Sequence, residues 1–274
     1  MFKSALITVD ELKAQFNNPK LVLLDCSIDK VNESLDDKEV KLIPNSIFFD
    51  IEKDFSDHDN PLPHTLVNPE TFTHHAQKLG IDSDSIIVVY DRWGIYSSPR
   101  AWWMFKVMGH QQVYVLNGGI IAWEDGGNEV FREYKIPGHK GNFEALFDQS
   151  LYADINYILE NYQNEKVDVI DARSDKRFFG LAPEPRKGLR SGHIPNSKNL
   201  PFDLVLDKDK YKSLAELNEI ISPLSNQQIF TCGSGISASI IAFASYLTGN
   251  QNLKIYDGSW SEWGKEELNL PIEK

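Results

Sequence analysis

The sequence predicts an α/β protein made of two tandem copies of one domain, each a parallel sheet flanked by helices on both faces. The first observation behind this prediction is an internal repeat. The paired segments are apolar runs ending in Asp at 21–25 and 167–171, Ile-Pro-Asn-Ser at 43–46 and 194–197, and apolar runs at 86–91 and 228–232. Paired positions stay 140 to 151 residues apart, as a tandem duplication with small loop changes requires.

The second observation is the alternation of short apolar runs with capped helices, which is typical of parallel sheets covered on both faces. Capping boxes at Thr8 with Glu11 and at Ser213 with Glu216 predict two helix starts. Three more helices are expected, at Asn68-Pro69 up to Gly80, at Ser98-Pro99 up to Gly109, and over 237–247 before Gly249.

A segment rich in glycine and polar residues, 136–142, lies between the last signals of the first copy and the first signals of the second. We therefore expect a first domain over residues 1–137, a linker over 138–150 and a second domain over 151–274.

Composition limits the possible partners of the chain. It has 274 residues, 41% of them hydrophobic, and a net charge of −12, which disfavours nucleic acid and anionic membranes as partners. No apolar h-region follows Met1 and no apolar run is long enough to span a bilayer, so a cytoplasmic protein is expected. The sequence has no metal-binding motif, and we expect neither a metal nor an organic cofactor.

Only two cysteines occur, Cys26 and Cys232, too few for a disulfide framework. Cys232 ends an apolar run and is followed by two glycines, Gly233 and Gly235, and then by a helix start. Inward-turned N–H groups and a helix N-terminus favour a thiolate at such a place. A buried structural cysteine before a tight turn is the alternative. Cys26 lies in an apolar run without such a loop and is interpreted as a core residue.

The first copy has Asp91 at the position of Cys232. Because Asp cannot carry sulfur, the first domain is expected to be a non-catalytic partner that shapes the site.

A second candidate segment carries Arg177 and Arg186 on a stretch with two prolines and a glycine. Two arginines on a fixed loop can hold a carboxylate through paired N–H groups; a solvated loop with salt bridges is the alternative. His193 is expected to be a hydrogen-bonding residue at a turn. His64 lies in a Pro-flanked loop that could present its imidazole to a site, although a surface histidine is the simpler interpretation.

These motifs resemble the tandem-rhodanese sulfurtransferases, most closely the 3-mercaptopyruvate sulfurtransferases. The segment from Cys232 to Ala238, CGSGISA, is similar to that subfamily's CGSGVTA loop. The other matching motifs are Asp171-Ala172-Arg173, Arg177-Phe178, Glu184-Pro185-Arg186, Gly192-His193-Ile194-Pro195, Tyr90-Asp91, the segment 98–104 and Leu116-Asn117-Gly118-Gly119.

The resemblance implies that Cys232 takes sulfur from 3-mercaptopyruvate as a persulfide and passes it to a thiol acceptor such as thioredoxin, or to cyanide. It implies that Ser234 and His64 relay a proton and that Arg177 and Arg186 hold the substrate. The loop residues Gly233, Gly235, Ile236 and Ser237 would complete the substrate site. An acidic position of the family's first domain falls on Glu52, where the family has Asp.

Three alternatives stay open. A thiosulfate:cyanide sulfurtransferase is the nearest, although such enzymes carry basic residues after the cysteine, where Ser234 and Gly235 are neutral. A phosphatase would need Arg six positions after the cysteine, and Ala238 stands there. A non-enzymatic rhodanese-like binding module would not need the intact cysteine loop.

Overall fold

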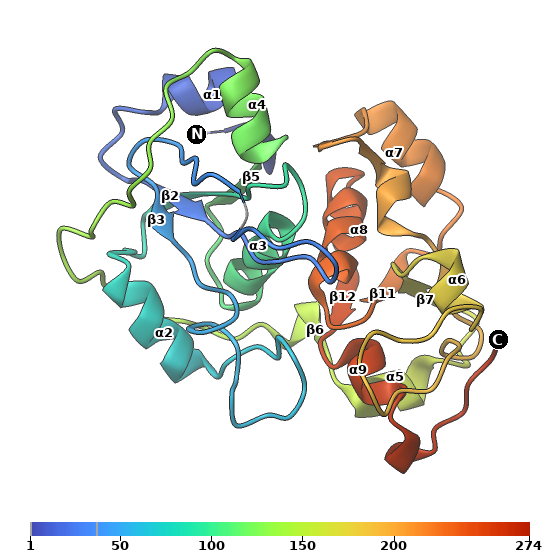
Figure 1. Ribbon diagram of the computed structural model, residues 1–274. Helices are drawn as coiled ribbons and strands as arrows, with labels where there is room; N and C mark the ends of the chain where they lie inside the picture. The colour runs from blue at the N-terminus through green and yellow to red at the C-terminus, as the bar shows by residue number, and fades with distance from the viewer. Residues whose placement is uncertain (1, 37) are drawn as a thin grey trace. The chain divides into compact units, whose positions relative to one another are not determined.

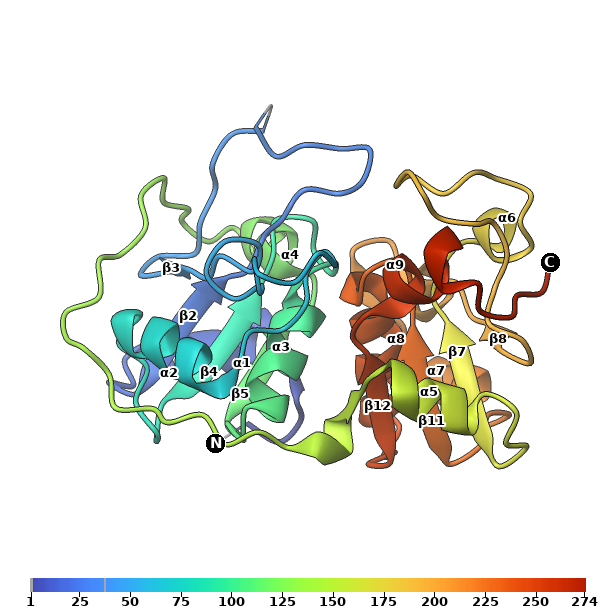
Figure 2. The same cartoon turned by 90° about the horizontal axis from the view of Figure 1, so that it is seen from below.

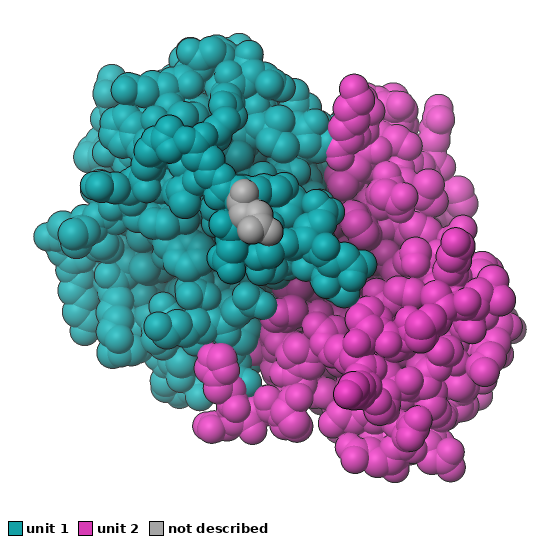
Figure 3. Space-filling model, viewed as in Figure 1, with its two compact units in different colours: residues 1–57, 66–148, 209–211 teal, residues 58–65, 149–208, 212–274 magenta. Residues whose placement is uncertain are grey.

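A computed structural model of the protein describes residues 2–36 and 38–274. The chain divides into two compact units, which Figure 3 shows in two colours. Unit 1 comprises Met1–Asp57, Leu66–Asp148 and Asp209–Tyr211, and unit 2 comprises His58–Thr65, Gln149–Lys208 and Lys212–Lys274.

Unit 1 is built on a five-stranded parallel sheet in the order β1-β5-β4-β2-β3. Its elements are β1 (Leu6–Ile7), α1 (Val9–Ala14), β2 (Leu21–Asp25), β3 (Ile47–Phe48), α2 (Pro69–Lys78), β4 (Ile86–Tyr90), α3 (Ser98–Val107), β5 (Val113–Leu116) and α4 (Gly119–Asp125). Figure 1 labels β2, β3 and β5 of this sheet. One core cluster joins Leu12 of α1 and Trp123 of α4 to the strands, whereas rings of Phe72 of α2 and Phe105 of α3 pack against one another in a second cluster.

Unit 2 repeats this topology with a parallel sheet in the order β6-β12-β11-β7-β8. Its main elements are β6 (Tyr152–Ala153), α5 (Ile155–Asn161), β7 (Val167–Asp171), α6 (Asp175–Phe178), β8 (Lys198–Asn199), α7 (Leu214–Ile221), β11 (Gln227–Thr231), α8 (Ile236–Leu247), β12 (Leu253–Tyr256) and α9 (Ser259–Trp263). Its shorter elements are η1 (Gln149–Leu151), η2 (Phe202–Val205), β9 (Leu206–Asp207) and η3 (Glu266–Leu268), whereas β10 (Lys210–Tyr211) belongs to unit 1.

The two sheets correspond strand by strand, since β4 of unit 1 and β11 of unit 2 hold the same central place. Figure 2 shows β2 beside β4 in one unit and β7 beside β11 in the other. The predicted fold class, two parallel sheets with flanking helices, is therefore confirmed. The duplication also places Asp91 and Cys232 at the same point, directly after the central strand.

The predicted helix caps are present at most positions. Thr8 and Ser213 head capping boxes, and the Asn68 side chain accepts the Thr71 N–H. The helix predicted to open at Ser98-Pro99 is α3, which begins at Ser98 and has Ser97 as its N-cap. The Ser98 hydroxyl donates to the Asp91 carboxylate at 2.7 Å.

The segment expected as a linker packs along unit 1 over most of its length. Gly141 and Phe143 donate backbone hydrogen bonds to Gln77 and Ile81, and Leu146 and Asp148 donate to the end of α3 and its C-cap. Among the described residues, no helix is long and apolar enough to cross a membrane.

Candidate active site

Cys232 directly follows β11, whose neighbours in the sheet are β12 and β7. Three residues separate it from α8, which begins at Ile236. The thiol therefore lies at the carboxyl end of a central parallel strand and at the N-terminus of a 12-residue helix. Ligands of open α/β sheets bind at this edge, and the helix end favours negative charge.

The backbone of the loop faces the sulfur with an N–H group. Gly235 donates its N–H to Sγ of Cys232 at 3.1 Å, from a left-handed conformation with φ of 85° that a glycine adopts without strain. The carbonyls of Cys232 and Gly233 accept hydrogen bonds from the N–H groups of Trp260 and Ser261 in α9. The Ser261 hydroxyl adds a bond of 2.6 Å to the Gly233 carbonyl. α9 thus satisfies these carbonyls, and the Gly235 N–H of the loop is directed at the sulfur.

Both candidate arginines reach this loop. A Cβ atom added to Gly233 would lie 3.1 Å from Nη2 of Arg177 and 3.8 Å from Nη1 of Arg186. Arg177 belongs to α6, and Arg186 to the irregular segment that follows it. The two guanidinium groups thus meet over a residue without a side chain, next to the thiol, where they can hold the carboxylate and carbonyl of a small substrate.

Glu184 fixes Arg177 in this position. Its carboxylate accepts from Nε and Nη2 of Arg177 at 3.2 and 2.5 Å and from Nη1 of Arg173 at 2.9 Å. Arg173 is buried, and its guanidinium also binds Asp171 and stacks over Trp260 at 4.3 Å. Burial lowers the pKa of Arg173, but the carboxylates of Asp171 and Glu184 outweigh burial and raise it above its ordinary value. Arg173 is therefore a permanent cation.

Ser234 connects the loop to a histidine. Its Oγ lies 2.9 Å from Nδ1 of His64 and accepts a long bond of 3.5 Å from Nη2 of Arg186. His64 has a φ of 59°, a left-handed conformation that is unusual for a residue with a side chain. The structure thus brings His64, Ser234, Arg177, Arg186 and the Cys232 loop together within unit 2, although His64 is 168 positions before Cys232 in the sequence.

The other expected site residues lie as follows. Gly235 is the N-cap of α8, and Ile236 and Ser237 form the first turn of this helix. Glu52 belongs to unit 1 and is exposed, so its part in a proton relay stays a prediction. His193 is buried and stacked on Phe178, and its Nδ1 lies 2.9 Å from the Phe178 carbonyl, as expected for a structural residue.

Cys26 follows β2 in unit 1 and is fully buried. Burial raises the pKa of its thiol well above the ordinary value, and the carboxylates of Asp25 and Asp91 raise it further. Cys26 is therefore an unreactive core residue, in agreement with the sequence interpretation.

Sequence reasoning gave no role to Glu184, Arg173 or Ser261. Glu184 and Arg173 did stand in recognised motifs, and a buried carboxylate between two arginines could have been suspected from them. Ser261 had no signal, because its contact joins helix α9 to Gly233, which is 28 positions away in the sequence.

The equivalent loop of unit 1 binds an anion of its own. Oδ2 of Asp91 accepts the N–H groups of Tyr96, Ser97 and Ser98 at 2.9 to 3.1 Å, and Oδ1 accepts the Trp93 N–H at 3.0 Å. Asp91 is completely buried, and the loop that surrounds it leads into α3. The turn between central strand and helix is therefore an anion receptor in this fold.

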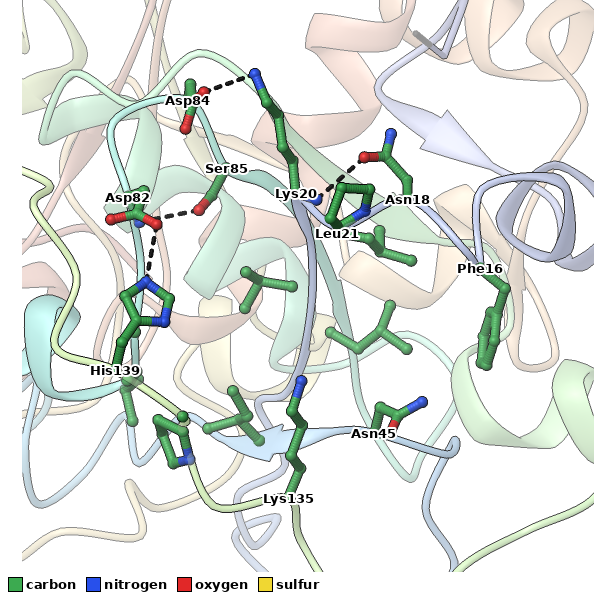
Figure 4. Close-up of a pocket in the computed structure, with 18 of the residues that line it drawn as sticks. Phe16, Asn18, Lys20, Leu21, Asn45, Asp82, Asp84, Ser85, Lys135 and His139 are labelled. Atoms are coloured by element: carbon green, nitrogen blue, oxygen red, sulfur yellow. Dashed lines mark hydrogen bonds and ion pairs between the residues drawn. The ribbon is translucent and has the colours of Figure 1, made fainter.

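Each unit contains a cavity lined by its own described residues. A cavity of about 480 Å³ in unit 2 includes Arg186 and Ser261 in its lining and so adjoins the Cys232 loop. Figure 4 shows a cavity of about 340 Å³ in unit 1, near the start of β2, where Lys20 pairs with Asp84 and His139 with Asp82. Its described lining contains no cysteine and neither of the candidate arginines.

Within the described part of the chain, no group of three or more His, Cys, Asp or Glu side chains is placed to hold a metal ion. The candidate site combines a thiol, two arginines, a hydroxyl and an imidazole.

Comparison with known proteins gives the same picture over nearly the whole chain. A family model described as Rhodanese-like domain matches residues 8–125 and 154–266. The 3-mercaptopyruvate sulfurtransferase of Escherichia coli K12 is 33% identical over 97% of this chain and 97% of its own length. The thiosulfate sulfurtransferase of Cricetulus griseus is 41% identical over 81% of this chain and 76% of its own. The crystal structure of SseA, a 3-mercaptopyruvate sulfotransferase from Escherichia coli, superposes with a TM-score of 0.84 at 30% identity, covering 95% of this chain and all of that one.

Proposed function

From the premise that this chain belongs to the rhodanese family, we propose that it is a sulfurtransferase that takes sulfur from 3-mercaptopyruvate onto Cys232. The observation that carries this proposal is the loop geometry: an N–H group directed at Sγ, with two guanidinium groups meeting over Gly233 beside it. Full-length similarity to the Escherichia coli 3-mercaptopyruvate sulfurtransferase supports it. The chemistry is assigned to unit 2, because unit 1 has Asp91 at the equivalent position.

The first half-reaction is a nucleophilic attack of the Cys232 thiolate on the substrate sulfur. An S–S bond forms while the substrate C–S bond breaks, and the bonding electrons of that C–S bond leave on the enolate of pyruvate. The proton of the substrate thiol ends on the methyl carbon of pyruvate, which leaves Cys232 as a persulfide anion. Arg177 and Arg186 hold the carboxylate and carbonyl, and hydrogen-bond donors aimed at the developing charge stabilise the transition state.

Ser234 and His64 are suited to move the proton. Their hydroxyl and imidazole are 2.9 Å apart, and Ser234 is two residues from the nucleophile. An enolate is a stronger base than either group, so a relay through them delivers the proton without bulk water.

In the second half-reaction a thiolate of an acceptor attacks the outer sulfur, and Cys232 leaves as a thiolate. We propose that a reduced thiol, such as that of a thioredoxin-like protein, is the acceptor. Cyanide performs the same displacement in an assay and yields thiocyanate.

Intact-protein mass spectrometry tests the proposal. After incubation with 3-mercaptopyruvate and no acceptor, the protein should gain the mass of one sulfur atom and release one equivalent of pyruvate. Cys232→Ser should do neither, whereas Cys26→Ser should behave like the wild type because Cys26 is sealed in the core. Pyruvate release by Cys232→Ser would refute the assignment.

Thiosulfate is the second candidate donor, favoured by the similarity to the Cricetulus griseus thiosulfate sulfurtransferase. The residue after Gly233 is the neutral Ser234, so the loop itself adds no cation for a dianion. Measurement of kcat/KM with both donors on the same preparation decides between them, and we expect the value for 3-mercaptopyruvate to be larger.

A further inference from the structure

Four buried or half-buried charged side chains form a continuous ion-pair network beneath the thiol loop. Asp171 binds Arg173, Arg173 binds Glu184, and Glu184 binds Arg177. The exposed fractions of the side chains of Asp171, Arg173 and Glu184 are at most 1%. This ion-pair network contains two carboxylates and two guanidinium groups, so its formal charges cancel.

Among these four residues, only Arg177 is appreciably exposed, with 22% of its side-chain surface accessible. Arg177 is also the residue that reaches Gly233. Two of its nitrogens, Nε and Nη2, are bound to the Glu184 carboxylate. An anion at Gly233 can therefore accept hydrogen bonds from Arg177. The positive charge of Arg177, however, is largely offset by the Glu184 carboxylate that binds it. Such a contact gives direction and hydrogen bonds more than long-range attraction.

We propose that Glu184 determines donor specificity, by holding Arg177 in place and cancelling its charge so that the site prefers a monoanionic sulfur donor to a dianionic one. This inference rests on the proposed function, because it concerns the donor of the same half-reaction. 3-Mercaptopyruvate carries one carboxylate, whereas thiosulfate carries two negative charges. Any unbalanced cation at the loop would attract the second donor about twice as strongly as the first.

The experiment is Glu184→Gln, which removes one negative charge and keeps an oxygen that can accept from the arginines. We expect kcat/KM for 3-mercaptopyruvate to fall and the ratio of kcat/KM for thiosulfate to that for 3-mercaptopyruvate to rise about tenfold. A tenfold change corresponds to the interaction of one added positive charge at the site with the second negative charge of thiosulfate, over roughly 10 Å at an effective dielectric constant of about 20. Glu184→Asp keeps the charge and should keep the ratio within about twofold of wild type, even if both activities fall.

Glu219→Gln on α7 is the matched control, since it removes the same charge from an exposed place in unit 2. It should leave the ratio unchanged. An unchanged or lower ratio in Glu184→Gln would overturn the inference and assign Glu184 a purely structural role. A wild-type protein that forms no persulfide with 3-mercaptopyruvate would instead sink the proposed function, so the two failures are distinct.

A second measurement needs only the wild-type protein, in case Glu184→Gln does not fold. Acetate and sulfate, one singly and one doubly charged, are compared as competitive inhibitors of persulfide formation. The inference expects similar inhibition constants or tighter binding of acetate. Sulfate binding more than about tenfold tighter than acetate would contradict the cancellation of the Arg177 charge by Glu184.

Discussion

Replacement of Gly233 by alanine tests the two-arginine site directly. The new methyl carbon would lie 3.1 Å from Nη2 of Arg177, closer than carbon and nitrogen normally approach. Arg177 cannot retreat cheaply, because the same nitrogen is bound to Glu184 at 2.5 Å. The methyl group would therefore occupy the place where the two guanidinium groups meet, and the substrate carboxylate would lose its closest contact.

The loss of one hydrogen bond to a charged group is worth about 1.5–3 kcal/mol, so kcat/KM for 3-mercaptopyruvate should fall about 10- to 100-fold. The fold should tolerate the change. Gly233 is not among the glycines with positive φ, and an alanine at a compatible backbone position restricts the unfolded chain, which offsets part of the crowding. We expect most of the loss to appear as a raised KM, since the thiol itself is untouched.

Steady-state pyruvate release measures this effect, with thermal unfolding recorded beside it. The rate at which the neutral reagent iodoacetamide alkylates Cys232 depends on the loop but not on anion binding by the arginines. In Gly233→Ala this rate should stay within about threefold of the wild-type rate. Gly138→Ala is the control, because a Cβ there meets no atom within 4 Å. Wild-type kcat/KM in Gly233→Ala would refute the reasoning, and an equal fall in alkylation rate would move the defect from the arginines to the loop backbone.

Two further substitutions test the surroundings of the site. Ser261→Ala removes the 2.6 Å hydrogen bond to the Gly233 carbonyl, so it should lower the free energy of unfolding by about 1 kcal/mol and slow persulfide formation. If neither the free energy of unfolding nor the rate of persulfide formation changes, the backbone N–H groups of α9 are sufficient to hold the loop. Burial raises the pKa of Glu262, which accepts the Tyr256 hydroxyl, so the folded state loses stability as pH rises from 4.5 through the raised pKa. Glu262→Gln should therefore raise Tm at pH 7 but not at pH 3.5, and a lower Tm at pH 7 would contradict this sign.

The sequence predicted the fold because each strand and helix is encoded locally. Thr8, Asn68 and Ser213 cap helices through bonds to residues three positions away, and such signals are visible without a structure. The start of α3 at Ser98 was likewise predicted, whereas the bond from the Ser98 hydroxyl to Asp91 was not, because it spans seven positions and depends on the loop between them.

The site was predictable only in part for the same reason. The strand, glycines and helix around Cys232 are contiguous, so their arrangement follows from the sequence. The contact between His64 and Ser234 spans 170 positions, and no periodicity encodes it. Glu184 is separated from Arg173 and Arg177 by an irregular segment, in which spacing does not fix direction, so only the structure shows that one carboxylate binds both arginines.

The duplication adds an argument for the persulfide that neither unit gives alone. An oxygen of the Asp91 carboxylate and the outer sulfur of a Cys232 persulfide both lie two bonds beyond Cβ, and both carry negative charge. In unit 1 the loop before α3 directs three N–H groups and the Ser98 hydroxyl at that oxygen. The fold therefore stabilises an anion at this distance from the chain. Unit 1 holds a carboxylate side chain at this point, whereas in unit 2 a cysteine at the same point can acquire a sulfur atom and release it to an acceptor.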